Sequence, residues 1–266
     1  MLATIREAWL RRAVIAHFVS LHLTTSYRTK ALGFLWALLD PLLFMGVYYL
    51  VFGYLIAQRP PEFMIHIFVG VISFRFLNRS MSQGASVLRS QSATIKEIKF
   101  PKVALPFSVV IARIFDFVAG WIIAIPLAFV FGVEPNAAWL VLPVLMLIQA
   151  VFVTGFTLIT AYVGVFFADI ENILDVGLRL WFYLSPVLYP ISVVQDKIDK
   201  LDQPILMQIY LLNPMVHVLQ AYEAPVVESR LPDASFVLGA AVSALVAFTL
   251  GLFVFTRAEG QMAKYV

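Results

Sequence analysis

Apolar stretches of roughly 20 residues recur along this chain, and they restrict its fold more than any other feature. A helix of that length crosses the hydrocarbon of a bilayer, and only helices or closed barrels satisfy their own backbone groups there. Apolar residues make up 61% of the 266 residues and charged residues only 13%. The stretches are Gly33–Ala57, Phe63–Met81, Val103–Gly132, Ala137–Ala168, Ile173–Val194 and Phe236–Phe255. We therefore expect an all-α membrane protein with six transmembrane helices in a single domain, residues 1–266.

The distribution of lysine and arginine predicts the orientation of these helices. With the N-terminus inside the cell, 13 of the 19 basic residues fall on cytoplasmic segments, as the positive-inside rule requires. These residues are Arg6, Arg11, Arg12, Arg28, Lys30, Arg75, Arg79, Arg89, Lys96, Lys99, Lys102, Arg257 and Lys264. Both termini, including the tail 257–266, are then cytoplasmic, and the protein is a multi-pass protein of the cytoplasmic membrane.

Two segments between or before the spans have patterns of their own. Within residues 1–30, Leu10, Val14, Phe18 and Leu21 recur at helical spacing beside arginines, which predicts an amphipathic helix lying in the membrane interface. Residues 195–234 contain an apolar stretch that Asn213 and Pro214 divide into halves too short to cross. We expect these halves to form a re-entrant helix pair on the external side, with residues 33–194 holding spans one to five and 235–256 the sixth.

The chain lacks the motifs of several enzyme classes. It has no cysteine, no Gly-Lys dipeptide for a phosphate-binding loop, no HExxH pair and no GxSxG motif. We therefore expect no catalytic residue, no metal site, and no ATP hydrolysis by this chain alone.

Charged residues inside the spans are the first candidates for a functional site. Asp40 and Arg113 lie at similar depths if both of their helices enter from the cytoplasm, and Asp116 follows one turn after Arg113. Such a cluster has two interpretations, a polar lining of a transport pathway or a structural ion pair between packed helices. Pro41 directly follows Asp40 and is expected to kink the first span.

Two further segments are distinctive. "LRLWFYLSPVLYP", residues 178–190, places Trp181, Phe182, Tyr183 and Tyr189 near the external end of a span. These rings fit either an ordinary interfacial aromatic belt or a set of stacking surfaces for sugars. The polar, basic segment Ser86–Pro106 is predicted to contain a short helix, Ser92–Phe100, that ends before Pro101.

Four blocks of sequence carry a resemblance to a known family. They are YRTKALGFLWALLDPLL, IKEIKFPKVALPFS, ADIENILDVGLRLWFYLSPVLYPIS and LLNPMVHVLQAY. In this order and spacing they resemble the ABC transmembrane type-2 permeases that export O-antigen, capsular polysaccharide or teichoic acid.

The resemblance implies a half-transporter. Two copies of the chain would form one channel for a polyprenyl-linked polysaccharide, and two copies of a separate ATPase would bind ATP and magnesium. The segment Ser92–Phe100 matches the family's coupling helix, and the broken hairpin matches its external gate. For ATPase coupling, the resemblance implies Ile95, Lys96, Glu97, Lys99 and Phe100. For the substrate channel, it implies Tyr48, Tyr49, Trp181, Phe182, Tyr183 and Tyr189. For the gate, it implies Asn213, Pro214 and His217.

Two alternatives remain open at this stage. An ABC type-2 exporter of small lipophilic molecules would have the same number of spans. An intramembrane glycan-lipid transferase would use Asp40, Asp116 or His217, although these residues come from different depths and faces. No nucleic-acid partner and no cofactor bound by this chain are expected.

Overall fold

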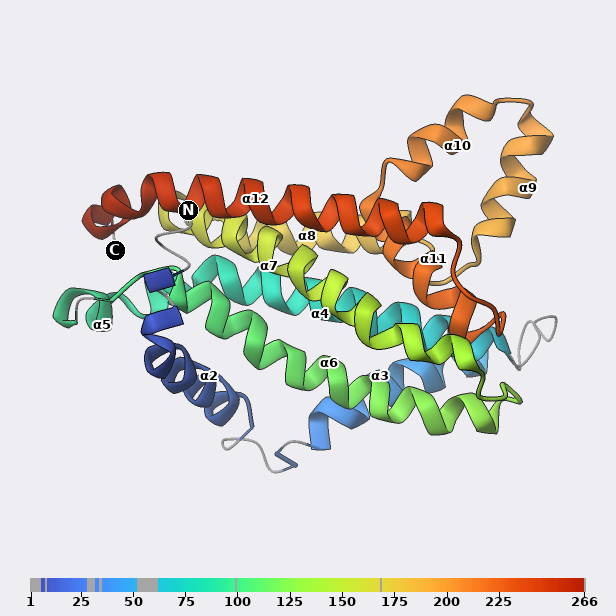
Figure 1. Ribbon diagram of the computed structural model, residues 1–266, viewed down its shortest axis with the longest axis horizontal. Coiled ribbons are helices and arrows are strands. Elements are labelled where there is room, and N and C mark those ends of the chain that lie inside the picture. The colour runs from blue at the N-terminus through green and yellow to red at the C-terminus, as the bar shows by residue number, and fades with distance from the viewer. Residues whose placement is uncertain are drawn as a thin grey trace.

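The computed structural model is an elongated bundle of helices (Figure 1). It describes residues 6–7, 9–27, 32–33, 35–51, 62–98, 100–167 and 169–265. Within these residues there are helices and no β-strand, so the all-α prediction is confirmed. The helices are α2 Arg12–Tyr27, α3 Leu35–Tyr48, α4 Glu62–Ser90, α5 Ser92–Glu97, α6 Ala104–Val130, the 3₁₀ helix η2 Ala137–Val141, α7 Leu142–Phe166, α8 Ile170–Leu184, α9 Ile191–Leu201, α10 Pro204–Leu211, α11 Pro214–Val226 and α12 Ala234–Tyr265.

Among the described residues, three helical segments are long and apolar enough to cross a membrane. They are Ala104–Val130, the combined segment Ala137–Phe166, and Ala234–Gly260. The first of these ends where a glycine is needed, because Gly132 has a φ of 82°, in the left-handed region that glycine adopts without strain.

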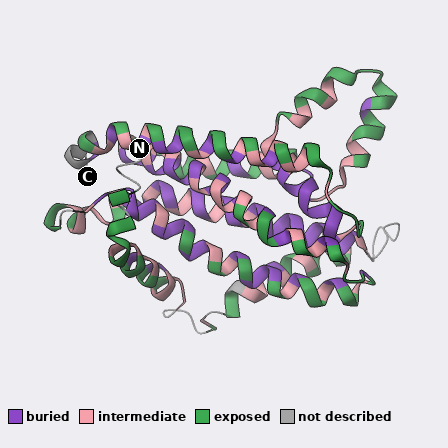
Figure 2. Cartoon of the chain, in the orientation of Figure 1, coloured by how far each residue is buried: buried purple, intermediate pink, exposed green. Residues whose placement is uncertain are grey.

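The outward faces of these helices carry large apolar side chains. Figure 2 shows exposed residues along the outer sides of α6 and α12 and buried residues on their inner sides. The large apolar side chains exposed there include Ile111, Phe115, Ile122 and Phe129 on α6 and Leu238, Val242, Leu245 and Leu250 on α12. Exposed apolar faces of this extent suit lipid rather than water.

The long helix α4 forms the centre of the bundle. It is buried along most of its length, from Phe63 to Leu88, and it contacts α3, α6, α7, α8 and α11. One apolar core surrounds its first two-thirds, and a second, smaller core surrounds Val87 and Leu88 at its end. The second core includes Phe18 of α2, which fixes the N-terminal helix to the bundle.

The α7 and α12 helices approach each other so closely that their backbones touch. A Cβ atom on Gly155 of α7 would overlap the backbone of Ala247, and one on Gly251 of α12 would overlap the carbonyl group of Gly155. Small residues permit such contact between helices in a membrane, where van der Waals packing replaces the hydrophobic effect. The α7–α12 pair is therefore a rigid part of the fold.

The structure corrects three of the predicted boundaries. The α4 helix continues past Met81 to Ser90, so the segment that begins at Ser86 is partly helical. The short helix α5 ends at Glu97 rather than Phe100. The fifth apolar stretch is not one helix: α8 ends at Leu184, since Ser185 is extended before Pro186, and a new helix begins at Ile191.

The segment 195–234 also differs from a simple helix pair. It contains the end of α9 together with α10 and α11, and the break between α10 and α11 falls at Leu212 and Asn213. The α11 helix is buried against α4 and α12, whereas α9 and α10 project from one end of the bundle (Figure 1). The part of the first stretch at residues 52–57 lies outside the described residues.

Adding one methyl group at the α7–α12 contact tests this packing. Gly251→Ala should lower the melting temperature in detergent, because its Cβ would overlap the Gly155 backbone. Gly260→Ala is the matched control on the same helix, since a Cβ there would meet nothing within 4 Å. The control should leave stability unchanged or raise it slightly, because alanine favours helix by about 1 kcal/mol over glycine. Equal melting temperatures for the two variants would contradict the close backbone contact.

Candidate functional site

Two adjoining cavities form a groove between α3, α4 and α8. Their volumes are about 590 Å³ and 430 Å³, and Asn78 and Asp175 line both of them. The first is mainly polar and includes Ser26, Tyr27, Trp36, Asp40, Asn78, Arg79, Ser82, Gln83, Arg113 and Asp175. The second is lined by Phe44, Tyr48, Val71, Phe74, Arg75, Asn78, Asp175, Leu178, Arg179, Phe182 and Tyr183. We call these the charged half and the aromatic half of the groove.

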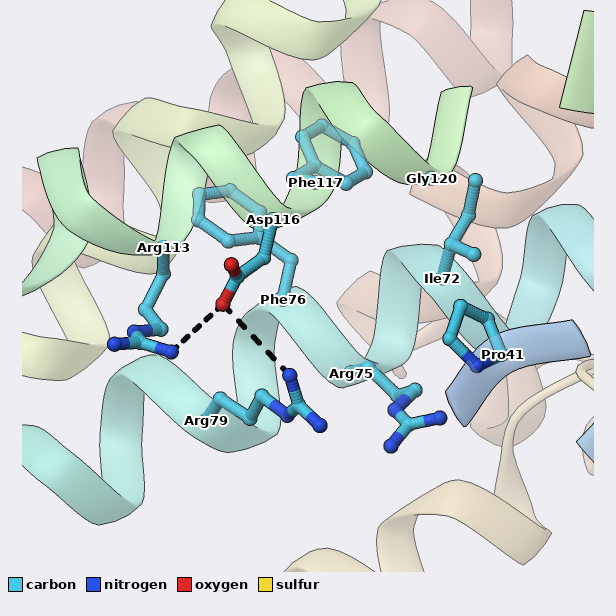
Figure 3. A pocket seen from close by; sticks show the side chains of 9 residues that line it. All are labelled: Pro41, Ile72, Arg75, Phe76, Arg79, Arg113, Asp116, Phe117 and Gly120. Atoms are coloured by element: carbon cyan, nitrogen blue, oxygen red, sulfur yellow. Dashed lines mark hydrogen bonds and ion pairs between the residues drawn. The ribbon is translucent and has the colours of Figure 1, made fainter. Parts of the chain in front are cut away.

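Two arginines of α4 connect the halves of the groove, because Arg79 lines the charged half and Arg75 lines the aromatic half. Arg75 and Arg79 are one helical turn apart, and both form ion pairs with Asp40 of α3. Arg79 Nη1 also lies 3.7 Å from Asp116 Oδ2 on α6. In Figure 3 the side chains of Arg79 and Arg113 converge on Asp116. The arginines of α4 thus join α3 to α6.

The partners of Asp40 differ from those expected from the sequence. Asp40 pairs with Arg75 and Arg79 in the described structure, not with Arg113, whose carboxylate partner is Asp116 at 2.7 Å. The two α4 arginines were assigned to a cytoplasmic segment, but they lie about three or more turns before the last residue of α4. Asp40 and Asp116 form ion pairs with them, as charges packed among apolar helices require.

The N-terminal helix α2 is tied to this network by side-chain hydrogen bonds. Arg113 Nη2 donates to Ser26 Oγ at 2.7 Å, and the Tyr27 hydroxyl donates to Asp116. One turn earlier, His22 lies 3.2 Å from Ser108 Oγ and accepts a hydrogen bond at Nδ1 from Gln83 at 3.1 Å. The α2 helix therefore contacts both α4 and α6 through buried polar groups.

His22 is held in its neutral form. Burial, and secondly the positive charge of Arg113, lower its pKa from 6.5 to about 4. The hydrogen bonds agree with this state: Gln83 donates to Nδ1, and the hydroxyl of Ser108 donates to the Leu105 carbonyl, so it can accept from His22 Nε2.

The aromatic half holds three of the six aromatic residues implied in the substrate channel. Tyr48, Phe182 and Tyr183 line it. Phe182 packs edge-on against Phe74 with ring centroids 5.2 Å apart, and Tyr183 is more than half exposed. Exposed rings held by packed neighbours provide flat faces on which a sugar ring can stack.

The other three aromatic residues lie elsewhere. The Tyr49 ring is 6.1 Å from that of Phe131 at the end of α6. Trp181 packs against Phe74 and Phe156 and donates its indole N–H to Asn213 at 2.8 Å. Tyr189 donates its hydroxyl to the carbonyl of Tyr183 at 2.9 Å, beyond the end of α8. Trp181 and Tyr189 therefore have structural partners around the Leu184 end of α8.

The implied gate residues form a junction between α8 and α11. The side-chain oxygen of Asn213 accepts from Trp181 and from the backbone N–H of Met215, so it caps α11. Its amide nitrogen donates to the Leu184 carbonyl and to Ser185 Oγ. An asparagine amide has two donors and one oxygen with two lone pairs, so this side chain uses its full capacity.

The other two implied gate residues belong to the same junction. Pro214 occupies the first turn of α11, where its missing N–H costs nothing. His217 donates from Nε2 to the Leu211 carbonyl at 2.8 Å, and its ring lies against Gly239 of α12, where a Cβ would overlap it.

The implied coupling residues lie on and after α5. Lys96 and Glu97 are at its exposed end, and Ile95 and Phe100 pack against the smaller core. The ring of Phe100 is 5.5 Å from that of Phe18 on α2. Ile98, which the sequence did not single out, is 57% exposed. Lys99 lies outside the described residues.

The predictions from the sequence did not include several residues that line the groove. Arg75, Asn78 and Arg79 recur at helical spacing on one face of α4, and this pattern in an otherwise apolar helix could have identified them. Asp175 and Arg179 have the same spacing of four residues on α8.

The groove offers groups that can bind a ligand. The described residues contain no group of three or more His, Asp or Glu side chains that could hold a metal ion. The carboxylates of Asp40 and Asp116 are both paired with arginines. The arrangement can bind anions and stack rings.

Residues 17–227 match the ABC-2 type transporter family, and the chain belongs to that family. It is 32% identical over its full length, and over the full length of the relative, to the O-antigen export system permease protein RfbA of Myxococcus xanthus. A protein of the same name from Klebsiella pneumoniae is 27% identical over 66% of this chain and 68% of its own. The polysialic acid transport protein KpsM of Escherichia coli is 23% identical over 90% of this chain and 92% of its own.

The state of His22 predicts how stability depends on pH. Because its pKa is lower in the folded protein, the unfolded chain binds the proton first, so stability should fall as the pH drops from about 6.5 towards about 4. His22→Gln should reduce this acid-dependent loss, measured as the difference in melting temperature between about pH 7.5 and about pH 5. His17→Gln, an exposed neighbour on α2, is the control and should behave like the unmodified protein. A full acid-dependent loss in His22→Gln would show that His22 does not titrate as described.

Proposed function

We propose that this chain is the permease subunit of an ATP-driven ABC exporter that moves a lipid-linked polysaccharide across the cytoplasmic membrane. The groove between α3, α4 and α8 carries this proposal, because it joins a charged half to an aromatic half along one side of the bundle. The names of the relatives, which refer to O-antigen export and polysialic acid transport, support the same class of substrate.

We propose six crossings by α3, α4, α6, α7, α8 and α12, with both termini in the cytoplasm. Contacts at one end of the bundle support this topology: Phe18 of α2 meets Phe100, and Lys102 is hydrogen-bonded to Glu259 near the end of α12. The projecting helices α9 and α10 are at the opposite end (Figure 1), which would be external.

The exposed face of α8 supports a homodimer. Leu178 is the one buried residue among those described on α8, and Asp175 and Arg179 are both exposed. Charged side chains on a lipid-facing surface are costly, whereas a second copy facing α3 and α8 would enclose them in a polar channel. Two grooves would then face each other across the dimer.

The two halves of the groove suit the two parts of a lipid-linked glycan. Arginines bind phosphate oxygens well, so Arg79 and Arg113 would attract the pyrophosphate of a polyprenyl carrier. Tyr48, Phe182 and Tyr183 would stack against the sugars attached to this pyrophosphate, since an aromatic face can pack on sugar rings of different kinds.

Energy would come from a separate subunit. The exposed end of α5, with Lys96, Glu97 and Ile98, would dock on an ABC ATPase, and two copies of that ATPase would bind ATP and magnesium. The permease would perform no chemistry and would need no cofactor of its own.

Two observations argue against the alternative functions, export of small lipophilic molecules and glycan-lipid transfer. A path for small lipophilic molecules has no use for the ion pairs of Asp40 with Arg75 and Arg79. A transferase would need reactive groups in one site, but His217 lies at the α11–α12 contact, outside the groove that Asp40 lines.

Depletion of the chain in its native cell tests the proposed function. Surface polysaccharide should disappear, and lipid-linked polysaccharide should accumulate on the cytoplasmic side, as measured by fractionation and glycan staining. Expression of the gene from a plasmid should restore the surface polymer. Unchanged surface polysaccharide would refute the proposal and favour export of small molecules.

Two adjacent tyrosines test the aromatic half. Tyr48→Ala removes a ring that lines the groove and should reduce export about tenfold, the effect of losing roughly 1.4 kcal/mol of stacking. Tyr49→Ala is the matched control, because this ring contacts Phe131 instead. Export is measured as polysaccharide delivered into inverted vesicles, normalised to the amount of permease. Equal export by the two variants would exclude Tyr48 as a stacking residue.

A further inference from the structure

The α8 helix is held loosely along its length and attached at its two ends. Leu178 alone is buried among its described residues. At the outer end, Asn213 binds Trp181, Leu184 and Ser185. At the other end, Arg89 Nη2 lies 2.9 Å from Glu171 Oε1 in the first turn of α8.

The position of Arg89 connects this ion pair to α5. Arg89 is the second-last residue of α4, and α5 begins three residues later at Ser92. A helix transmits displacement along its axis, and the link between Arg89 and Ser92 is too short to absorb much of it. Movement of α5 would therefore act first on the last turn of α4, which holds Arg89.

The other end of the α5 segment is fixed to a different helix. The backbone N–H of Lys102 donates to Glu259 Oε1 at 2.8 Å, and its ammonium group donates to the Glu259 carbonyl at 2.9 Å. Glu259 belongs to α12, which is packed against α7 through glycine contacts. The Lys102 end is thus anchored to α12, and the Arg89 end, which is the last turn of α4, is paired with α8, a helix that has one buried residue among those described.

Glu171 lies on the face of α8 that lines the groove. Glu171, Asp175, Leu178 and Phe182 recur at intervals of four, three and four residues, which places them along one stripe of a helix. The last three of these residues line the groove. A displacement applied at Glu171 would therefore turn or shift the lining of the groove directly.

We propose that the Arg89–Glu171 ion pair is the link through which movement of α5 is transmitted to α8 and so to the groove. This inference rests on the proposed function, in which an ATPase moves α5. Arg89 and Glu171 are positioning residues: they touch neither substrate nor nucleotide. Both side chains are partly exposed, at 30% and 52%, and such a pair contributes little to folding. Variants of the pair should therefore fold and assemble.

Charge reversal tests the link in the reconstituted permease–ATPase complex. Arg89→Glu and Glu171→Arg should each lower the amount of polysaccharide exported per ATP hydrolysed by at least about fivefold, a modest value for coupling between sites. The double reversal should restore the ratio, because the ion pair re-forms with its charges exchanged. A normal ratio in the single variants, or a double variant as poor as either one, would overturn the inference.

A second ion pair provides the matched control. Arg230 and Glu228, at the opposite end of the bundle, also form an exposed pair, with 2.6 Å between Arg230 Nε and Glu228 Oε2. Arg230→Glu makes the same change of charge away from α5 and α8, and it should leave the ratio unchanged. A reduced ratio in this variant would mean that charge reversal itself, and not the link, disturbs coupling.

The absence of cysteine permits a chemical version of the test. The double variant Arg89→Cys/Glu171→Cys introduces the only two thiols in each copy of the chain. A short bis-methanethiosulfonate cross-linker between them should restore the export ratio, and its removal by a reductant should lower the ratio again. A ratio that does not respond to cross-linking would contradict transmission through this contact.

A measurement without polysaccharide separates this inference from the proposed function. A spin label at Asn172→Cys, an exposed position in the first turn of α8, reports the distance between the two α8 helices of a dimer. This distance should change when ATP binds, should stop changing in Arg89→Glu, and should change again in the double reversal. The same ATP-dependent change in distance in all three proteins would refute transmission through Arg89 and Glu171. A complex that shows the expected changes in distance but exports no polysaccharide would refute only the proposed substrate.

Discussion

The constraint on which the structure depends is the presence of two arginines, Arg75 and Arg79, in the middle of its central helix. A charge within an apolar bundle must be paired or reach water. Asp40 meets this requirement from α3, and Asp116 contributes from α6. Because each acceptor lies on a different helix, the pairing fixes how α3 and α6 are turned towards α4. The groove follows from that arrangement, since the same arginines line it.

The bundle is divided into a rigid part and a loosely held part. In the rigid part, α7 packs against α12 and α4 with glycines at contacts that leave no room for a Cβ, and α6 packs on α4 through stacked rings such as Phe76 and Phe117, 4.7 Å apart. In the loose part, α3 and α8 expose many side chains. In the proposed homodimer, a surface that forms a channel with another copy cannot be fully buried within one copy, so α3 and α8 are the helices expected to line that channel.

The sequence predicted the class of fold and a cluster of Asp40, Arg113 and Asp116, but not the arginines that pair with Asp40. Long apolar runs determine α6, α7 and α12 almost alone. The partner of Asp40 was missed because Arg75 and Arg79 were interpreted as part of a cytoplasmic segment, although their spacing of four residues fits one face of a helix. The end of α8 was recoverable, since a residue before proline favours extended backbone, as Ser185 shows. Which aromatic rings face the groove was not recoverable: neighbours such as Tyr48 and Tyr49 diverge according to packing with other helices.

The two attachments of α8 differ in strength, and this difference indicates which end moves. At the Leu184 end, the Asn213 amide makes three hydrogen bonds, to Trp181, Leu184 and Ser185. At the other end, Arg89 and Glu171 form a partly exposed ion pair, which tolerates a change in geometry at little cost. A helix fixed at one end and driven at the other pivots about the fixed end, so displacement is greatest near Glu171 and decreases towards Tyr183. In the proposed transporter, the charged half of the groove would therefore widen more than the aromatic half, which admits the anionic head of a substrate while the rings downstream keep their spacing.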